Sequence, residues 1–229
     1  GVMNENITST RLGLKGIPAL AEELQVARDL FLLEYTGGKL HISTISTATS
    51  VALIREAKKK KLNITCSVAI HNLYFTDDVL TDFNTNYKVL PPLRTQSDID
   101  ALIEAVKDGT IDMVTSDHNP IDIENKKIEF DHAKYGSIGL ESCFGALQKA
   151  TDLETAIQAL TQQSVFNVSQ SSISLGQKAN ITLFDPTLKW VFKKEHIIST
   201  SKNAALLEQP LLGKAYGIIN NSQVDYVYQ

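Results

Sequence analysis

The chain has 229 residues, of which 43% are hydrophobic and 21% charged, and its formal net charge at pH 7 is −4. This size and composition allow a sizeable buried core, which excludes a disordered polypeptide. The acidic balance excludes the basic footprint of a nucleic-acid-binding protein. The one cationic run, Lys58–Lys61, falls at the end of a predicted helix, where cations complement the helix dipole.

The sequence also argues against a membrane or secreted protein. No segment reaches the roughly 18 consecutive apolar residues of a membrane span, and Gly1–Glu5 contain no apolar signal-peptide core. Cys66 and Cys143 lie far apart, with neither metal-ligand spacing nor a disulfide framework. We therefore expect a soluble, cytoplasmic protein with no membrane contact.

The first two thirds of the chain alternate between helix and strand patterns. The predicted elements, in chain order, are a helix from Ile17 to Gly37, a strand over Lys39–Ile45, a helix from about Ala48 to the lysine run, a strand over Leu62–Ala69, a helix capped by Ser97 and stopped by Gly109, and a strand over Thr110–Thr115. Strands that alternate with helices of this length predict βαβ crossovers and a parallel sheet, as in a TIM barrel or a doubly wound fold.

The last third has a different pattern. Short strand-like runs separated by turn residues occur at Asn180–Phe184, Trp190–Phe192, Ala215–Ile219 and Val224–Tyr228. They predict a small β module that follows the α/β part. We place the boundary near Ser169–Gln177, which divides the chain into residues 1–170 and 171–229.

Candidate functional residues follow the predicted strands. In parallel α/β folds such residues gather at the carboxyl ends of the strands, which here hold Thr44, His71 and Asp117. Asp117, followed by His118, could ligate a metal or take a proton from a metal-bound water. It could equally cap the next turn, and His71 could be a hydrogen-bonded structural histidine.

Several segments together resemble the dihydroorotase branch of the amidohydrolase superfamily, in family order and over most of the chain. The segments that carry the resemblance are Leu12–Pro18 with Ala21-Glu22, Pro91–Arg94, Asp108–Asp112, Val114–Pro120 with its Asp-His-x-Pro motif, Gly136–Glu141 and Gly176–Pro186. The resemblance implies an α/β fold, namely the C-terminal part of a TIM (β/α)8 barrel, about strands 6–8, followed by a β-sandwich segment. It also implies a zinc-dependent hydrolase of cyclic amides that interconverts carbamoyl aspartate and dihydroorotate in pyrimidine biosynthesis.

By this resemblance, Asp117 is the catalytic aspartate and a candidate metal ligand, and the substrate pocket involves His71, Leu90, His118 and Ile121. The chain departs from the family pattern at two of these places and at Thr44. Thr44 stands where the family has a zinc-binding histidine, Leu90 where it has a pocket asparagine, and Ile121 where it has a histidine. We therefore expect the zinc site to be absent or incomplete in this chain.

Three hypotheses remain. The first is an active metal-dependent hydrolase that forms when the chain joins a missing N-terminal half, from the same protein or a second chain. The second, which the three departures favour, is a non-catalytic homologue that supports aspartate transcarbamoylase. The third is a hydrolase with an altered metal site and a different cyclic amide or imide. A homo-oligomer is expected in each case.

Overall fold

The computed structural model describes residues 1–161, 173–221 and 223–226. Its helices and strands, in chain order, are β1 Met3–Asn4, α1 Ile7–Leu12, β2 Gly16–Ile17, α2 Ala19–Thr36, β3 Leu40–Ile42, α3 Ala48–Lys59, β4 Ile64–Ala69, α4 Gln96–Lys107, β5 Met113–Thr115, α5 Cys143–Ala150, α6 Leu153–Thr161, β6 Asn180–Val191, β7 Pro210–Asn220 and β8 Gln223–Tyr226. Short 3₁₀ turns connect several of them, the first being η1 Ile70–Leu73.

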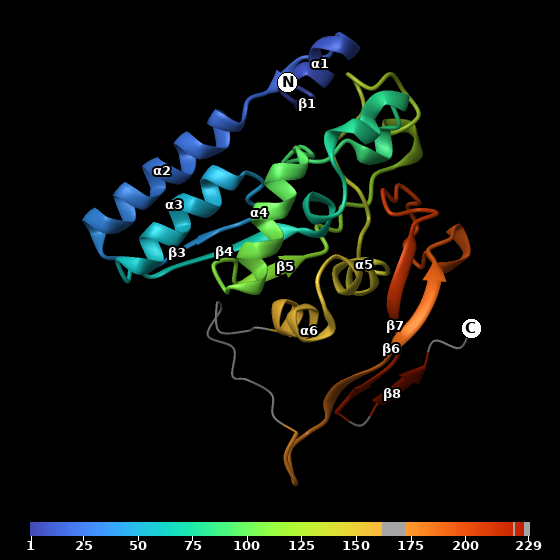
Figure 1. Ribbon diagram of the computed structural model, residues 1–229. Coiled ribbons are helices and arrows are strands. Elements are labelled where there is room, and N and C mark those ends of the chain that lie inside the picture. Colours follow the sequence, from blue (N-terminus) through green and yellow to red (C-terminus); the bar gives the residue numbers. More distant parts are fainter. Residues whose placement is uncertain (162–172, 222, 227–229) are drawn as a thin grey trace.

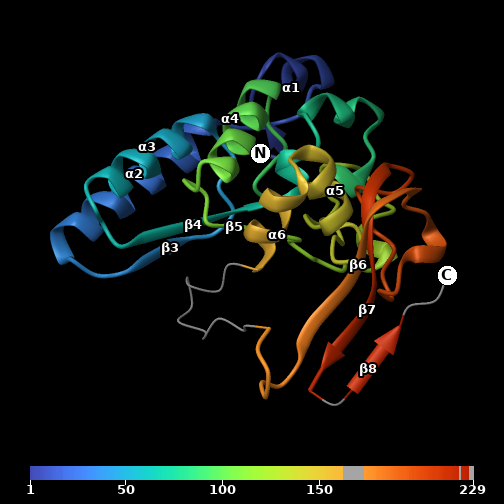
Figure 2. The same cartoon turned by 60° about the horizontal axis from the view of Figure 1, so that its bottom comes forward.

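A three-stranded parallel sheet in the order β3-β4-β5 forms the centre of the α/β part. Leu40 pairs with Ile64, and Val68 pairs with Val114. The helices α2, α3 and α4 lie side by side over one face of this sheet (Figures 1 and 2). The α/β alternation and the parallel sheet are therefore confirmed.

Each of the three covering helices has a buried apolar face, although α2 also exposes large apolar side chains on its other side. In α3, for example, Val51, Ile54 and Ala57 are buried, at the three- to four-residue spacing of one helix face. Buried residues of the sheet, including Cys66 and Val68 of β4 and Val114 of β5, belong to the same hydrophobic core as these positions. That core continues into the last third of the chain, where Phe192 and Leu206 are fully buried.

The last third of the described chain is a three-stranded antiparallel sheet, β6-β7-β8. Two short helices join it to the α/β part, since α6 contacts β5 and α5 contacts β7 (Figures 1 and 2). The runs predicted at Asn180–Phe184 and Trp190–Phe192 belong mostly to one strand, β6, whose pairing with β7 shifts register on both sides of Asp185. Because a bulge absorbs these shifts, the turn-like residues between the runs do not end the strand.

Some expectations from the sequence need correction or stay untested. Thr95, not Ser97, caps α4: it forms a capping box with Asp98, whose carboxylate accepts hydrogen bonds from the Thr95 backbone and hydroxyl. The parallel strands β3, β4 and β5 form an open sheet with β3 and β5 at its edges. No closed barrel is seen among the described residues. The predicted division at residues 170 and 171 lies outside the described residues, as do residues 227 and 228 of the last predicted strand.

No helix in the described ranges is both long and apolar enough to cross a bilayer.

Candidate functional site

The chain leaves β3 through Thr44, which adopts a left-handed conformation with φ of 52°. Its backbone N–H donates to Ser67 Oγ of β4 at 3.1 Å, and the next residue, Ile45, donates to the Ser67 carbonyl at 3.0 Å. A threonine rarely adopts this conformation, because its branched side chain crowds the backbone. These two bonds hold the turn that leads from β3 into α3.

The Glu22 carboxylate occupies the N-terminal end of α3. It accepts hydrogen bonds from the backbone N–H of Ser46 at 2.8 Å and of Thr47 at 3.3 Å, from Ser50 Oγ at 2.8 Å, and from Ser46 Oγ. A helix leaves its first amide groups without intrahelical partners, and a carboxylate there also gains from the helix dipole. Glu22 therefore joins α2 to the start of α3.

Arg94, from the turn before α4, is the cation of this cluster, and 2% of its side chain is exposed. Its Nε donates to Ser46 Oγ at 3.1 Å, its Nη1 donates to Asn4 Oδ1 at 2.7 Å and to the Ile17 carbonyl at 2.8 Å, and its Nη2 lies 4.0 Å from Glu22 Oε2. Burial lowers the pKa of Arg94, while the Glu22 charge raises it. A buried guanidinium with this many partners holds together the segments that it contacts.

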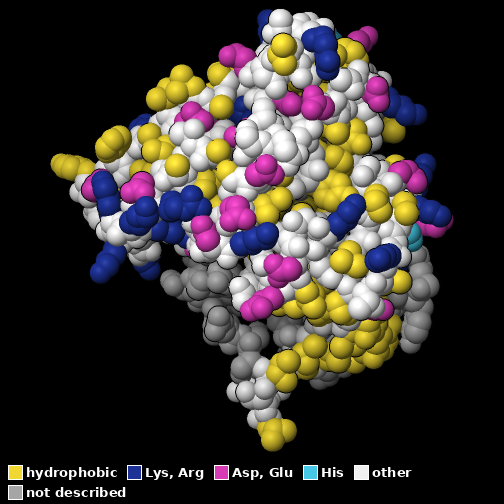
Figure 3. Space-filling model, viewed as in Figure 1, with side chains coloured by type: hydrophobic (Ala, Val, Ile, Leu, Met, Phe, Trp, Pro, Cys, Tyr) yellow, Lys and Arg dark blue, Asp and Glu magenta, His cyan; other side chains and the backbone are white. Residues whose placement is uncertain are grey.

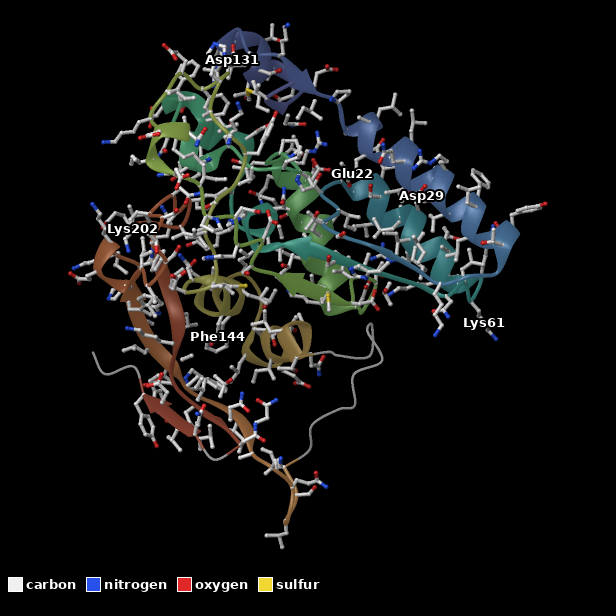
Figure 4. All side chains as sticks on the ribbon, turned by 180° about the vertical axis from the view of Figure 1, so that it is seen from behind. Glu22, Asp29, Lys61, Asp131, Phe144 and Lys202 are labelled. Carbon is white, nitrogen blue, oxygen red and sulfur yellow. The ribbon has the colours of Figure 1, made fainter. Side chains whose placement is uncertain are left out.

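A cavity of about 530 Å³ lies between α2, the end of β3 and the turn before α4. Thr44 and Leu90 both line it, together with Glu22, Gln25 and Asp29 of α2. Glu22 and Asp29 project from α2 toward the body of the molecule (Figure 4). Two of the sequence-predicted site residues, Thr44 and Leu90, are therefore brought to one cavity.

His71 follows β4 in η1 and is completely buried. Among the described residues, neither ring nitrogen has a hydrogen-bond partner of normal geometry. Burial lowers the pKa of His71 to about 4, and the nearby Asp117 backbone opposes this shift only in part. His71 is therefore a neutral imidazole at neutral pH, held by packing.

Asp117 follows β5 with a left-handed φ of 43°. Its Oδ1 accepts a hydrogen bond from Asn119 Nδ2 at 3.0 Å, and its backbone N–H donates to Thr115 Oγ1 at 3.1 Å. Burial raises the pKa of this carboxyl, and the Asn119 hydrogen bond lowers it. Asp117 is therefore a half-buried carboxylate whose polar side-chain partner is the amide of its own turn.

His118 and Ile121 are fixed by the segment Gly136–Leu140 and by Asn203. His118 Nδ1 accepts hydrogen bonds from the backbone N–H of Gly139 at 3.2 Å and of Leu140 at 3.3 Å, so the neutral ring carries its proton on Nε2. The Ile121 N–H donates to Asn203 Oδ1 at 3.1 Å. Both residues therefore brace the loop after β5.

Gly139 shows how close the β4 and β5 ends are. A Cβ at Gly139 would lie 3.4 Å from His71 Cε1 and 2.3 Å from the Ser116 carbonyl oxygen, so only glycine fits between them. His71, Ser116 and His118 thus all lie against the loop at Gly139. A second link joins η1 to the cavity at β3, because Asn72 Nδ2 donates to the Pro92 carbonyl at 3.0 Å.

The donor groups of this site do not fit a catalytic zinc, which needs three or four protein ligands. Asp117 offers a carboxylate, but Thr44 offers a neutral hydroxyl, and the ring of His71 is enclosed. Among residues 1–161, 173–221 and 223–226, no three His, Cys, Asp or Glu side chains gather as the ligands of one ion. The donors in these ranges therefore do not complete a zinc site.

Two important residues, Glu22 and Arg94, receive no role from the sequence pattern. A signal for Glu22 is present in Ser46 and Thr47, because hydroxyl residues just before an amphipathic helix indicate an N-terminus that needs acceptors. Nothing in the local pattern points from those residues to a carboxylate 24 positions earlier. Arg94 gives no local signal, because its partners come from four separate segments.

Comparison with known proteins places these observations in a family. No protein-family model matches the chain. The dihydroorotase of Geotalea daltonii is 38% identical over 232 residues, which cover 98% of this chain and 55% of that protein. The dihydroorotase of a Thermoanaerobacter species is 41% identical over 234 residues, which cover 99% of this chain and 54% of that protein. The chain belongs to the dihydroorotase family. It spans about half the length of the curated dihydroorotases that it matches.

Solved structures agree on the fold of this dihydroorotase homologue. An L-hydantoinase from Arthrobacter aurescens superposes with a TM-score of 0.80 at 20% identity, covering 90% of this chain and 49% of the other. An inactive dihydroorotase-like domain of a Chaetomium thermophilum CAD-like multifunctional protein superposes with a TM-score of 0.62 at 16% identity, covering 87% and 54%. At these identities the likeness concerns the fold alone.

Proposed function

We propose that this chain is part of a dihydroorotase-family protein of pyrimidine biosynthesis that no longer catalyses the family reaction. The observation that carries the proposal is Thr44, which stands at the end of β3 where the resemblance expects a zinc-binding histidine. Its backbone is held in place by Ser67, so the turn after β3 carries a hydroxyl at this position. A neutral hydroxyl is a poor zinc ligand compared with an imidazole, a carboxylate or a thiolate.

The changed pocket supports the same proposal. Leu90 lines the cavity together with Thr44, and Ile121 braces the loop after β5. Dihydroorotate and carbamoyl aspartate are anions, which polar and cationic side chains would hold. Replacing an asparagine and a histidine by leucine and isoleucine removes hydrogen bonds that a site for such anions would need.

The role we propose for a non-catalytic homologue is to bind and support aspartate transcarbamoylase in the cytoplasm. We also propose that the open edge of β3 and the cavity under α2 accept the N-terminal half of a barrel, whose last strands are β3, β4 and β5, and that the antiparallel sheet belongs to a β-sandwich. The open sheet order supports this. So does the hydantoinase-like fold, of which this chain covers about half.

The test restores the lost groups in the full-length protein. Thr44→His, combined with Leu90→Asn and Ile121→His, should raise bound zinc from well below one to near one ion per protein, because the imidazole that the resemblance expects at position 44 is restored to the ligand set of the whole protein. Thr36→His, at the exposed end of α2, is the matched control and should change nothing. Stoichiometric zinc and ring opening by the unmodified protein would instead establish the active hydrolase.

A binding experiment tests the partner. Immobilised full-length protein should retain aspartate transcarbamoylase from the same organism in a two-component mixture, and should retain an unrelated protein of similar charge no better than the bare matrix. If aspartate transcarbamoylase passes through at micromolar concentrations of both proteins, the proposed supporting role is wrong.

A further inference from the structure

The outward face of α2 carries an apolar stripe made of Leu20, Leu24, Phe31 and Tyr35. Their exposed fractions are 57%, 60%, 72% and 89%. Figure 3 shows apolar side chains along the outer edge of the molecule that α2 forms in Figure 1. Four large exposed apolar residues on one helix face mark an interaction surface, whereas a single exposed apolar residue is common on any protein surface.

The stripe faces away from the rest of the protein. Successive helix residues turn by about 100°, so the four side chains fall within an arc of about 60°, roughly opposite the buried Val26 and Leu33. A third arc of the helix, with Gln25 and Asp29, lines the cavity beside β3. An element that extended the sheet at β3 would therefore cover that third arc and leave the stripe exposed.

The spacing of the stripe is symmetric. From Leu20 to Tyr35 the intervals are four, seven and four residues, centred between Ala27 and Arg28. We propose that α2 packs against α2 of a second copy of this chain, antiparallel across a two-fold axis that passes beside Ala27. Leu20 then meets Tyr35 of the second copy, and Leu24 meets Phe31. The small side chain of Ala27 lets the two helices approach closely at the axis.

The charges around the stripe suit this arrangement. Arg28 Nη2 is paired with Asp29 Oδ1 at 2.8 Å, so the region next to the axis is close to neutral. On the other flank, Lys60 Nζ lies 3.0 Å from Glu34 Oε2. The two-fold axis brings Glu23 of one copy near Glu34 and Lys60 of the other, because 23 and 34 lie almost symmetrically about the centre. Lys60 then stands between two carboxylates.

The expected dimer is weak. A stable interface buries roughly 800 Å² on each partner, and four partly exposed side chains on one helix supply less than that. We therefore expect dissociation in the range of about 10 to 100 μM, and a weaker dimer at high salt because the Lys60 contacts are exposed.

Cross-linking in the full-length protein tests the geometry. The double variant Leu24→Cys with Phe31→Cys should form intermolecular disulfides under mild oxidation and run as a dimer on a non-reducing gel. Either single variant should stay monomeric on that gel, because the two-fold axis separates equal positions along the helix by about 10 Å. The native Cys66 and Cys143 are buried and contribute no background.

Sedimentation measures the association itself. Phe31→Glu should weaken self-association at least tenfold, while Ile7→Glu, at an apolar position of α1 that is 84% exposed, should leave it unchanged. A protein that stays monomeric at 200 μM overturns the proposal. So does an unchanged dimer in Phe31→Glu, or a double cysteine variant that cross-links no better than the single ones. Capture of a different protein by the stripe, with no self-association, also overturns it.

Discussion

The end of β3 and the ends of β4 and β5 are built in opposite ways. At β3, Glu22 and Arg94 are buried among seven hydrogen bonds and one ion contact. At the ends of β4 and β5, His71 is buried, and neither of its ring nitrogens forms a hydrogen bond with the described residues. The Asp117 carboxylate accepts a side-chain hydrogen bond from the amide of Asn119. The first region joins several helices and strands through buried polar contacts, whereas the second has few polar side-chain contacts among the described residues.

This difference is compatible with the proposed loss of site residues from a fold that is retained. A buried charge network is strongly destabilised when one member is lost, so substitutions at Glu22 or Arg94 cost stability. Thr44, Leu90 and Ile121 lie outside this network, so a change of their side chains does not remove a partner from a buried charge. Four substitutions test this contrast, and they follow in order of decreasing expected effect.

Arg94→Met should destabilise the protein most. It leaves Ser46 Oγ, Asn4 Oδ1 and the Ile17 carbonyl without their buried donor and removes the cation that faces Glu22. We expect a loss of about 3 to 5 kcal/mol in the free energy of unfolding. Urea denaturation of the full-length protein measures it. Arg55→Met, which removes a half-exposed pair with Asp108, is the control and should cost less than about 1 kcal/mol. Equal losses in the two variants would refute the contrast.

His71 should give the stability a distinct pH dependence. Its pKa is about 4 in the folded protein, against 6.5 for the ordinary side chain. The unfolded chain thus binds the proton first, and the stability present above pH 6.5 is lost as the pH falls toward 4, by up to about 3 kcal/mol. His71→Leu should flatten the unfolding free energy over this range and change it little at neutral pH. A slope that is as steep in His71→Leu as in the unmodified protein would contradict the assignment.

Glu22→Gln should have an intermediate effect. The amide keeps the shape but loses the charge that faces Arg94 and the first amides of α3, and its NH₂ group turns one acceptor into a donor. We expect a loss of about 1 to 2 kcal/mol. Glu23→Gln, its neighbour on α2, serves as the control and should change the unfolding free energy by less than about 0.5 kcal/mol. If both variants unfold at the same urea concentration, Glu22 does not have the proposed anchoring role.

Asp117→Asn should change the protein least. The half-buried carboxylate has one side-chain hydrogen bond, from Asn119, and burial already disfavours its charge. We expect less than about 1 kcal/mol of change in stability, and no change in dihydroorotate ring opening by the full-length protein. A large fall in ring opening would mean that Asp117 still acts in catalysis.

The scaffold was more predictable from the sequence than the site. The helices α3 and α4 and the strand β4 follow from apolar periodicity, which burial against a sheet imposes directly. In α2 the periodic residues Leu20, Leu24 and Phe31 also predict a helix, but their side chains face outward instead of toward the sheet. The pattern missed α5 and α6, which are short. A Cβ on Gly145 of α5 would lie 2.9 Å from the Gly213 carbonyl oxygen, a tertiary contact that no local pattern encodes. The pattern also split β6 at Asp185, because a bulge and a turn have similar composition.

The site was predictable only in part, for a physical reason. The rule that active residues follow strands located Thr44, His71 and Asp117, and the resemblance added Leu90, His118 and Ile121. Their roles stay predictions. The rule could not show that Glu22, Ser46 and Arg94 would meet, because hydrogen bonds between distant segments depend on the completed fold. It also could not show that His71 would lose all contact with solvent.

Loss of the family reaction can be measured as dihydroorotate ring opening by the full-length protein in zinc-supplemented buffer, with metal analysis of the same sample. We predict turnover no faster than that of the Asp117→Asn variant, together with substoichiometric zinc. Turnover that zinc stimulates, that chelation removes, and that Asp117→Asn abolishes would contradict the proposal.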